Sequence, residues 1–442
     1  MDESWLAELS EFIRIPSVSA DAERAGDVRA AGEWVCDFVR RAGGNAELRD
    51  WKGHPLALGE IQASTGNAAP TIVCYGHFDV QPPTPLDLWQ SDPFEATVRD
   101  GRLYARGIAD DKGQLYMLLK AAEELAAADE LPVDIRICCD GEEETGGHSI
   151  VDFLAVDERG GDACVIFDSA MLKPEVPLFN LSTRGLVYFH LRVVTGDRDL
   201  HSGVFGGAAL NAIHALVESL QAVLPRDGYL PEPLRFGIAE PTAEELAAWA
   251  ELTPGADELA SQGARSADPK AAEEFYLRTF AEPALDMNGI EAGSPYLQKT
   301  VLPVEAHANL SIRLAPGQDP DRVAPEVERL LREAAPDGAQ LELTRLSSAP
   351  PGLVDPDSPA VRLGLEAFER AIGTRPLLVR SGGTLPIVPA LADKGIPTIL
   401  TGFALPDSNI HSPNENIPVD YVPLGVRAAR ELYKAFSRLR AA

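Results

Sequence analysis

The sequence predicts an α/β protein into which a second, α+β domain is inserted. Strand-like apolar runs alternate with amphipathic helical segments at both ends of the chain, which is typical of α/β folds. Near Arg184-Gly185 the pattern changes to that of a small α+β domain, and it changes back after Ala349-Pro350-Pro351-Gly352. The chain of 442 residues is also too long for one ordinary core. We therefore expect one domain made of residues 1–184 and 354–442, and an inserted domain of residues 185–353.

Helix and strand signals divide the larger domain. Ser4 can cap a first helix, and Pro16 ends it because proline disfavours the helical conformation in the residue before it. A second helix is expected at about 25–41, where Gly43-Gly44 supplies a left-handed stop. The remaining helices are expected at about 112–128, 359–372 and 422–439, and the strands at 71–75, 133–139 and 163–167 and near Leu377 and Thr398.

The inserted domain is expected to alternate strands and helices. The strands are expected at 186–194, 304–314 and 340–346, and the helices at 208–224 and 319–335. Residues 225–299 interrupt this pattern with a Pro- and Glu-rich insertion that has helices of its own. One of these helices begins with the capping-box sequence Thr242-Ala243-Glu244-Glu245, in which the first and last residues satisfy each other's backbone amides.

The composition limits the partners and the compartment. The formal net charge of −29 argues against binding to nucleic acid or to an anionic membrane surface, because a polyanion would be repelled. The five cysteines are odd in number and lie mostly in apolar runs, which favours reduced thiols over a disulfide framework. The start of the sequence does not resemble a leader, and no apolar run approaches about 18 residues. We therefore expect a cytoplasmic protein with neither a nucleic acid nor a membrane as partner.

Four strand-like runs lead into side chains that can bind metal. They lead into Glu142-Glu143-Glu144, into His77-Phe78-Asp79, into Asp168 and towards His411. The carboxyl ends of strands are where α/β sheets place their chemistry. Each signal alone has an ordinary alternative, because a run of glutamates can be a solvated turn and a lone histidine is commonly structural. Four such strand ends together favour a metal-binding site over these separate structural roles. The remaining candidates lack such a setting and are interpreted as structural or surface histidines: His54, His148, His190, His214 and His307.

The same residues can hold a pair of divalent metal ions. Two cations at close range need a bridging ligand, and Asp110 could supply it. The alternative for Asp110 and Asp111 is helix capping, because they precede a helix whose N-terminus favours anions. One ion would then be completed by His77 and Asp168, and the other by Glu144 and His411. Asp79 would orient His77, and Glu143 would remain free to take a proton from water.

Five motifs, spread over nearly the whole chain, carry a family resemblance. They are Gly76-His77-Phe78-Asp79-Val80, Arg106-Gly107-Ile108-Ala109-Asp110-Asp111-Lys112-Gly113, Glu142-Glu143-Glu144-Thr145-Gly146, Asp168, and Ile410-His411-Ser412-Pro413-Asn414-Glu415. Together they resemble those of the co-catalytic dizinc metallopeptidases, a family that includes cytosolic dipeptidases, carnosinases, aminoacylases, glutamate carboxypeptidases and succinyl-diaminopimelate desuccinylases. The resemblance implies a mixed sheet with helices on both faces, a cis Asp110-Asp111 peptide and the metal roles given above. It implies two divalent ions per subunit, with Zn²⁺ as the first choice and Mn²⁺ or Co²⁺ as alternatives.

The segment from Asp199 to Gly207 resembles the dipeptidase and carnosinase branch most closely, as does the long insertion. This resemblance implies that the inserted domain is a lid and dimerisation domain, and that His201 reaches the active site of the neighbouring subunit of a homodimer. It also implies that His201, Thr300, Arg313 and Thr384 bind substrate, although Thr384 stands where serine is expected. Apolar and polar residues alternate around Arg313, so Arg313 lies on the polar face of a strand, where a surface salt bridge is the alternative role.

The resemblance implies a hydrolase that cleaves dipeptides carrying a free C-terminal carboxylate, by means of a water activated between two metal ions. Glu143 would take the proton, and His201 would steady the oxyanion. One alternative is an N-acyl-amino-acid deacylase of the same family. Another, from a different class, is a metal-binding protein without catalytic activity. The presence of Glu143 argues against the second alternative, because binding alone does not need a base.

Overall fold

The computed structural model describes residues 1–64, 66 and 68–439, and it divides into two compact units. The first unit consists of Met1–Leu181, Val354–Val379 and the described chain from Ala390 on, and the second consists of Ser182–Leu353 and Arg380–Pro389. The sequence pattern assigns Arg380–Pro389 to the larger domain, whereas the structure places this segment in the second unit. Local backbone pairing explains the difference, because the Ser381 amide donates a hydrogen bond to the Ser182 carbonyl (2.8 Å).

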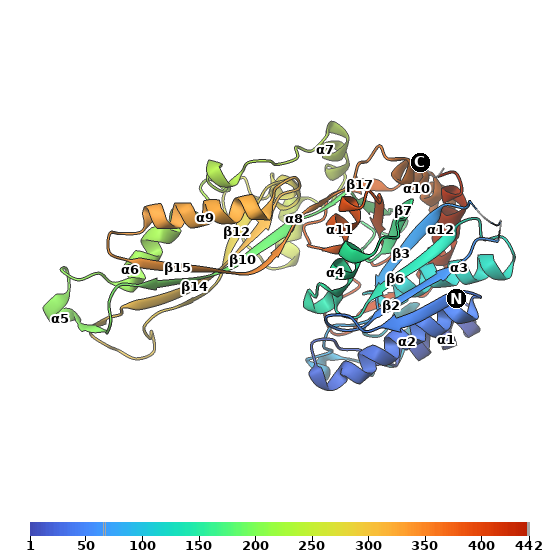
Figure 1. The fold of residues 1–442 in the computed structure, drawn as a ribbon, viewed down its shortest axis with the longest axis horizontal. Helices are drawn as coiled ribbons and strands as arrows, with labels where there is room; N and C mark the ends of the chain where they lie inside the picture. The colour runs from blue at the N-terminus through green and yellow to red at the C-terminus, as the bar shows by residue number, and fades with distance from the viewer. Residues whose placement is uncertain (65, 67, 440–442) are drawn as a thin grey trace. The chain divides into compact units, whose positions relative to one another are not determined.

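The first unit is built on an eight-stranded mixed sheet (Figure 1). In spatial order its strands are β1 (Asn45–Arg49), β2 (Leu56–Ile61), β6 (Asp134–Asp140), β3 (Thr71–His77), β7 (Ala163–Phe167), β18 (Thr398–Thr401), β8 (Leu178–Asn180) and β17 (Leu377–Val379). The central strands β6, β3, β7 and β18 are parallel to their neighbours in this group, and β1 and β2 add an antiparallel edge. The central strands are almost continuously buried, as expected for parallel strands covered on both faces.

Helices cover both faces of this sheet. The helices of the first unit are α1 (Glu3–Ile13), α2 (Ala25–Arg41), α3 (Lys112–Ala127), α4 (Ser149–Val156), α10 (Pro359–Ile372) and α12 (Tyr421–Phe436), and α11 (Ile387–Asp393) leads into the first unit from the second. On β1, Leu48 packs on Gly32 of α2, whereas the guanidinium carbon of the next residue, Arg49, lies 5.4 Å from the ring centroid of Phe153 in α4. Successive strand residues point to opposite faces, so α2 and α4 lie on opposite sides of the sheet.

The helix ends follow ordinary capping chemistry. The Ser358 hydroxyl caps α10, whose first residue is Pro359, and Gly373 ends it with a left-handed φ of 93°. At the N-terminus Asp2 caps α1 instead of Ser4, because its carboxylate accepts a hydrogen bond from the Ser4 amide (2.7 Å).

A small sheet in the first unit holds two loops close together, residues 106–110 and residues 411–415. It consists of β4 (Thr97–Arg99), β5 (Arg102–Tyr104) and β19 (Asn416–Pro418), in the order β19-β5-β4. β5 and β19 are antiparallel, so the chain that leaves β5 towards α3 runs beside the chain that enters β19. This pairing brings residues 106–110 next to residues 411–415, although some 300 positions separate them in the sequence.

The second unit is a four-stranded antiparallel sheet with two helices packed on one face. The strands, in the order β12-β14-β10-β15, are β12 (Ala284–Glu291), β14 (Glu305–Leu314), β10 (Gly185–Val194) and β15 (Gln340–Ala349), and the helices are α6 (Ala212–Leu220) and α9 (Pro320–Ala334). Buried and partly exposed residues alternate strictly along β10, which leaves one face of the sheet partly exposed.

Smaller elements lie at the two ends of this sheet (Figure 1). One end carries a two-stranded ribbon and a short helix: β11 (Leu200–His201), β13 (Val301–Leu302) and α5 (Ser202–Phe205). Further elements of the second unit are α7 (Ala243–Trp249), α8 (Gly255–Ser261), a 3₁₀ turn (Glu232–Leu234), a five-residue π-helical turn (Leu277–Ala281) and the short pair β9 (Ser182–Thr183) and β16 (Gly352–Leu353). The capping box predicted for Thr242 and Glu245 is present at α7.

The elements β1, β2, α4 and β12 are not predicted from the sequence. β12 lies within residues 225–299, which read as helical. Its exposed positions and the bulge between Met287 and Gly289 weaken the alternation that identifies a strand. All five cysteines are free and buried, as expected from their setting. Among the described residues, no helix is both long enough and apolar enough to cross a membrane.

Candidate metal centre

Three neighbouring parallel strands bring candidate ligands to one edge of the large sheet. β3 ends at His77, β6 is followed by the 3₁₀ turn Glu143–Thr145, and β7 ends directly before Asp168. Because the three strands are parallel, their carboxyl ends lie at the same edge. Asp110 joins them from the segment that precedes α3, and its peptide bond to Asp111 is cis, as the family resemblance implies.

Asp110 lies between two imidazoles. One carboxylate oxygen is 2.9 Å from Nε2 of His77, and the other is 2.8 Å from Nε2 of His411. His411 Nε2 is also 3.1 Å from Oε2 of Glu144. The two oxygens of one carboxylate thus face two different nitrogen ligands, which is the arrangement that a bridging ligand requires.

The imidazole of His77 is oriented by its other nitrogen. Nδ1 lies 3.1 Å from the carbonyl oxygen of Asp79, and because a carbonyl can only accept, Nδ1 is the donor. In the neutral ring this leaves the lone pair of Nε2 free to bind a cation. The Asp79 carboxylate accepts hydrogen bonds from the backbone amides of Glu143 and Glu144 (3.2 Å each), so it joins the end of β3 to the acidic turn.

Two side chains that the sequence interpretation did not single out support this part of the site. The Ser19 hydroxyl donates to the Asp79 carboxylate (2.5 Å), and the Gln81 amide group donates to Oε2 of Glu144 (2.9 Å). Ser19 lies in the loop between α1 and α2, far from any motif, so a contact of this kind cannot be found from sequence pattern. Gln81 directly follows the motif that contains His77, and this position in the sequence could have indicated that Gln81 lies near the site.

Glu415 fixes the segment that presents Asp110. Its buried carboxylate accepts hydrogen bonds from the backbone amides of Gly107 (3.1 Å), Ala109 (2.8 Å) and Asp110 (3.1 Å). It also pairs with the buried guanidinium of Arg106 (2.6 Å). Four donors on one carboxylate hold the backbone of Asp110 in place, and Glu415 lies in the same motif as His411. One motif therefore contributes both a candidate ligand and the anchor of another.

Burial and crowded charge shift the pKa values in this cluster. Burial raises the pKa of Glu143 to about 8, and it raises the pKa of Asp168 to about 7, where the charge of Asp110 adds to the rise. Burial alone would also raise the pKa of Asp110, but hydrogen bonds from His411 and His77 outweigh it and hold this pKa below its usual range. The hydrogen bond with Asp110 raises the pKa of His411 to about 10.

The donor set fits divalent cations. His77, Asp110 and Glu144 each offer a ligand atom, and these atoms lie within 4.8 Å of one another. Imidazole and carboxylate are the ligands that Zn²⁺, Mn²⁺ and Co²⁺ accept. The carboxylates outnumber the imidazoles, and neighbouring carboxylates add to the effect of burial in raising the pKa values of Glu143 and Asp168. A cation would relieve that excess and displace protons from the imidazoles.

The sequence matches a protein-family model over residues 73–435, which is most of the chain, and the model describes peptidase family M20/M25/M40. The chain belongs to this family. The match contains every residue of the cluster described above except Ser19. As a member of the M20/M25/M40 family, the protein is a peptidase, and the α/β architecture predicted from the sequence is confirmed.

Individual relatives within the family are similar over nearly their whole length. The Cys-Gly metallodipeptidase dug1 of Schizosaccharomyces pombe is 29% identical, with 96% of this chain and 94% of the relative covered. The metallo-carboxypeptidase Sso-CP2 of Sulfolobus solfataricus has a TM-score of 0.85 and 28% identity over 99% of this chain and 100% of that chain. Human carnosine dipeptidase 1 has a TM-score of 0.76 and 25% identity over 99% of this chain and 96% of that chain.

The other predicted site residues of this M20/M25/M40 peptidase lie in the second unit, in two separate places. His201 is exposed in β11, where it pairs with Val301, and its Nδ1 accepts a hydrogen bond from the Gly203 amide (3.0 Å). Thr300 lies beside it, because its carbonyl accepts a bond from the Ser202 amide (3.0 Å). Arg313 is far along β14, and its guanidinium donates to the Thr384 hydroxyl (2.8 Å). The structure thus groups these residues as two pairs.

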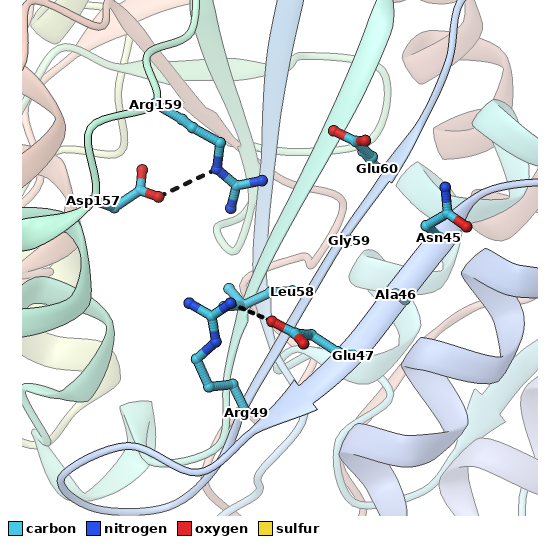
Figure 2. Close-up of a pocket in the computed structure, with 9 residues that line it drawn as sticks. All are labelled: Asn45, Ala46, Glu47, Arg49, Leu58, Gly59, Glu60, Asp157 and Arg159. Atoms are coloured by element: carbon cyan, nitrogen blue, oxygen red, sulfur yellow. Dashed lines mark hydrogen bonds and ion pairs between the residues drawn. The ribbon is translucent and has the colours of Figure 1, made fainter.

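A surface pocket of about 380 Å³ lies on the antiparallel edge of the first unit's sheet. Figure 2 shows its lining residues: Asn45, Ala46, Glu47, Arg49, Leu58, Gly59, Glu60, Asp157 and Arg159. The charged groups largely pair with each other, since Arg49 pairs with Glu47 and Arg159 with Asp157. None of the candidate metal ligands lines this pocket.

Proposed function

We propose that this M20/M25/M40 peptidase hydrolyses dipeptides that carry a free C-terminal carboxylate, with the help of two divalent metal ions. The observation that carries the proposal is the position of Asp110 between Nε2 of His77 and Nε2 of His411. A carboxylate shared by two imidazoles is suited to bridging two cations. The similar yeast and human proteins named above as dipeptidases support the choice of substrate class.

The proposed ligands divide into two sets that share Asp110. His77 and Asp168 would hold one ion, and Glu144 and His411 would hold the other. Bound ions of this kind polarise a carbonyl and lower the pKa of water. We propose Zn²⁺ as the native metal, with Mn²⁺ or Co²⁺ as alternatives. The five free, buried cysteines support the further proposal that the protein works in a reducing compartment, the cytoplasm.

Glu143 is the proposed general base. Its carboxylate oxygen lies 4.0 Å from Nε2 of His77, close to the ligands, while its own backbone amide is held by Asp79. Burial raises its pKa to about 8, and the charge of two bound cations would lower it, so that the carboxylate could take a proton at neutral pH and pass it to the leaving amine. Asp79 would keep both His77 and Glu143 in position.

Arg313 and Thr384 are the proposed binding site for the substrate carboxylate. Arg313 lies on the polar face of β14 and has a hydroxyl partner, Thr384, but among the described residues no carboxylate lies within ion-pair distance of it. A guanidinium with spare donors suits a carboxylate ligand. The Thr384 hydroxyl donates in turn to the Arg184 carbonyl (2.7 Å), so its lone pairs face Arg313.

A substrate panel tests this specificity. We expect a dipeptide to be hydrolysed faster than its C-terminal amide by roughly 10- to 150-fold in kcat/KM, the value of a charge-assisted hydrogen bond. Arg313→Ala should remove that preference while lowering activity on the free acid. The panel also includes an N-acetyl amino acid, which a deacylase would prefer. Equal discrimination between acid and amide by both enzymes would show that the carboxylate is recognised elsewhere.

Within one chain, the pair His201 and Thr300 lies too far from the pair Arg313 and Thr384 for both pairs to contact the same dipeptide. Arg313 lies eight residues beyond Glu305, the start of β14, which corresponds to roughly 25 Å of strand. His201 and Thr300 lie beyond that start, in the ribbon at the other end of the sheet (Figure 1). A dipeptide spans only about 7 Å. We therefore propose a homodimer in which His201 and Thr300 serve the active site of the neighbouring subunit, where His201 polarises the scissile carbonyl.

Mixing two inactive variants tests this arrangement. His201→Ala and Glu143→Gln chains should each be nearly inactive as homodimers. A heterodimer would hold one site that lacks both groups and one that is intact, so we expect up to about half of the wild-type activity per heterodimer, or about a quarter in a random equimolar mixture. Mass spectrometry or differential tags verify that heterodimers form. If verified heterodimers remain inactive, then His201 serves its own subunit or has no role in catalysis.

A further inference from the structure

The loop that carries Thr384 is short, contains two glycines and is held by its backbone. We call residues 380–384 the return loop. Its Ser381 amide donates to the Ser182 carbonyl (2.8 Å), and its Gly383 carbonyl accepts from the Arg184 amide (2.8 Å). Gly382 and Gly383 have wide conformational freedom, so these bonds alone leave the position of Thr384 weakly defined. The side chain of the first loop residue, Arg380, supplies a much stronger anchor.

Arg380 is buried against the insertion. Its Nε and Nη2 donate to the two carboxylate oxygens of Glu245 (2.6 and 3.2 Å), and Nη1 donates to the Ala239 carbonyl (2.7 Å). Only 2% of Arg380 and 3% of Glu245 are exposed to solvent. The guanidinium also lies 5.8 Å from the ring centroid of Trp249 in α7. A bidentate, buried pair of this kind defines both position and orientation.

Glu245 has a second partner that fixes it in turn. As the last residue of the capping box, its carboxylate also accepts a hydrogen bond from the Thr242 amide (2.7 Å). The N-terminus of α7 and the return loop therefore depend on the same carboxylate. An ordinary capping box needs only a glutamate on the surface, whereas this glutamate is buried and paired with arginine. The pairing exceeds what the helix start requires.

A second buried arginine joins the insertion to the same region. Arg184 donates to the Thr279 and Glu282 carbonyls (3.1 Å each), and Thr279 and Glu282 lie in or next to the π-helical turn of the insertion. The Arg184 carbonyl accepts the hydrogen bond of the Thr384 hydroxyl. Both neighbours of the Arg313–Thr384 contact are thus fixed to residues 239–282, and these side-chain contacts add to the backbone hydrogen bonds of the return loop.

From these contacts we propose that the insertion sets the specificity of the peptidase. Glu245 is a positioning residue: through Arg380 it holds the return loop so that the Thr384 hydroxyl orients the Arg313 guanidinium towards the substrate carboxylate. This inference rests on the proposed role of Arg313 in binding that carboxylate. If the Glu245–Arg380 pair were purely structural, it would not affect the choice of substrate. In our proposal the pair allows the enzyme to discriminate between a free acid and its amide.

The test measures acid and amide hydrolysis by Glu245→Gln. This variant keeps the shape and the capping oxygen of Glu245 but removes its charge. We expect the KM for a free-acid dipeptide to rise about tenfold with kcat nearly unchanged, and the preference for acid over amide to fall by the same factor. Turnover of the amide and the metal content should stay at wild-type values. Hydrogen exchange should quicken at the Ser381 amide, which reports release of the return loop.

Two further variants keep the test decisive. Glu245→Met combined with Arg380→Leu replaces the pair with apolar side chains, which buried pairs often tolerate, so it decides the matter if Glu245→Gln fails to fold. Glu274→Gln is the matched control, because Glu274 pairs with Arg278 inside the insertion without reaching the return loop, and it should keep the wild-type preference.

Loss of the acid preference in the folded Glu245 variants, but not in the control, supports the proposal. An unchanged ratio of acid to amide turnover in a folded variant overturns it, as does a parallel loss of both activities. A wild-type enzyme without any preference for the acid would instead overturn the proposed carboxylate site itself, and the present inference with it. The wild-type measurement therefore distinguishes the two failures.

Discussion

Glu143→Gln is expected to lower kcat by about 10²–10⁴ while leaving two metal ions bound per chain. Glutamine has the shape of glutamate but cannot take a proton, and Glu143 is not one of the proposed ligands. Its carboxylate oxygen nevertheless lies only 4.0 Å from Nε2 of His77, so it is close enough to act where the ligands converge. Steady-state kinetics and elemental analysis of the same sample measure the two quantities.

The matched control for Glu143→Gln is Glu47→Gln. It makes the same chemical change in the same unit, at the surface pocket of Figure 2, where Glu47 pairs with Arg49. Near-normal activity is expected, because this pocket contains none of the candidate ligands. Near-normal turnover of the Glu143 variant, or a loss of metal equal to its loss of rate, would contradict the assignment of Glu143 as base.

Glu144→Ala and His411→Ala are expected to lower metal occupancy itself. The two side chains contact each other, because His411 Nε2 lies 3.1 Å from Oε2 of Glu144. The Glu144 carboxylate is almost fully buried. Removing an outer-shell partner commonly weakens metal affinity 10- to 100-fold, so loss of a direct ligand should weaken it by at least about that much. Calorimetric titration of the metal-depleted variants measures this affinity separately from catalysis.

Asp407→Asn is the control for the His411 variant. Asp407 lies in the same loop, but its exposed carboxylate pairs with Arg102 rather than with the cluster. It should bind metal as the wild type does. If Glu144→Ala and His411→Ala keep a full complement of tightly bound metal, the proposed ligand set is wrong, whatever their activity.

The sequence predicts the strand ends of the site because two local signals coincide there. Buried strands give continuous apolar runs, and ligand side chains follow them directly, as His77 follows β3 and Asp168 follows β7. The family motifs add residues that no strand pattern reveals. His411 lies in a loop with a left-handed φ of 61°, and only its motif identifies it.

Supporting contacts could not be predicted in the same way, because they depend on tertiary geometry. Ser19 donates to Asp79 across 60 positions, and Arg380 meets Glu245 across 135. The sequence shows the capping box of α7, but it does not show that the same glutamate is buried against an arginine. β12 was missed for a related reason. An exposed edge strand with a bulge lacks clear alternation of apolar and polar residues, and β12 is defined by its backbone pairing with β14.

We propose that the cluster around Asp110 is a two-metal centre that makes the chain a dipeptidase. The most direct measurement strips the protein with a chelator and then titrates it with Zn²⁺, following bound metal and hydrolysis of one dipeptide in the same samples. We predict negligible activity in the stripped protein and a rise in activity that ends when two ions are bound per chain. Full activity of the stripped protein, or a maximum reached with a single bound ion, would contradict it.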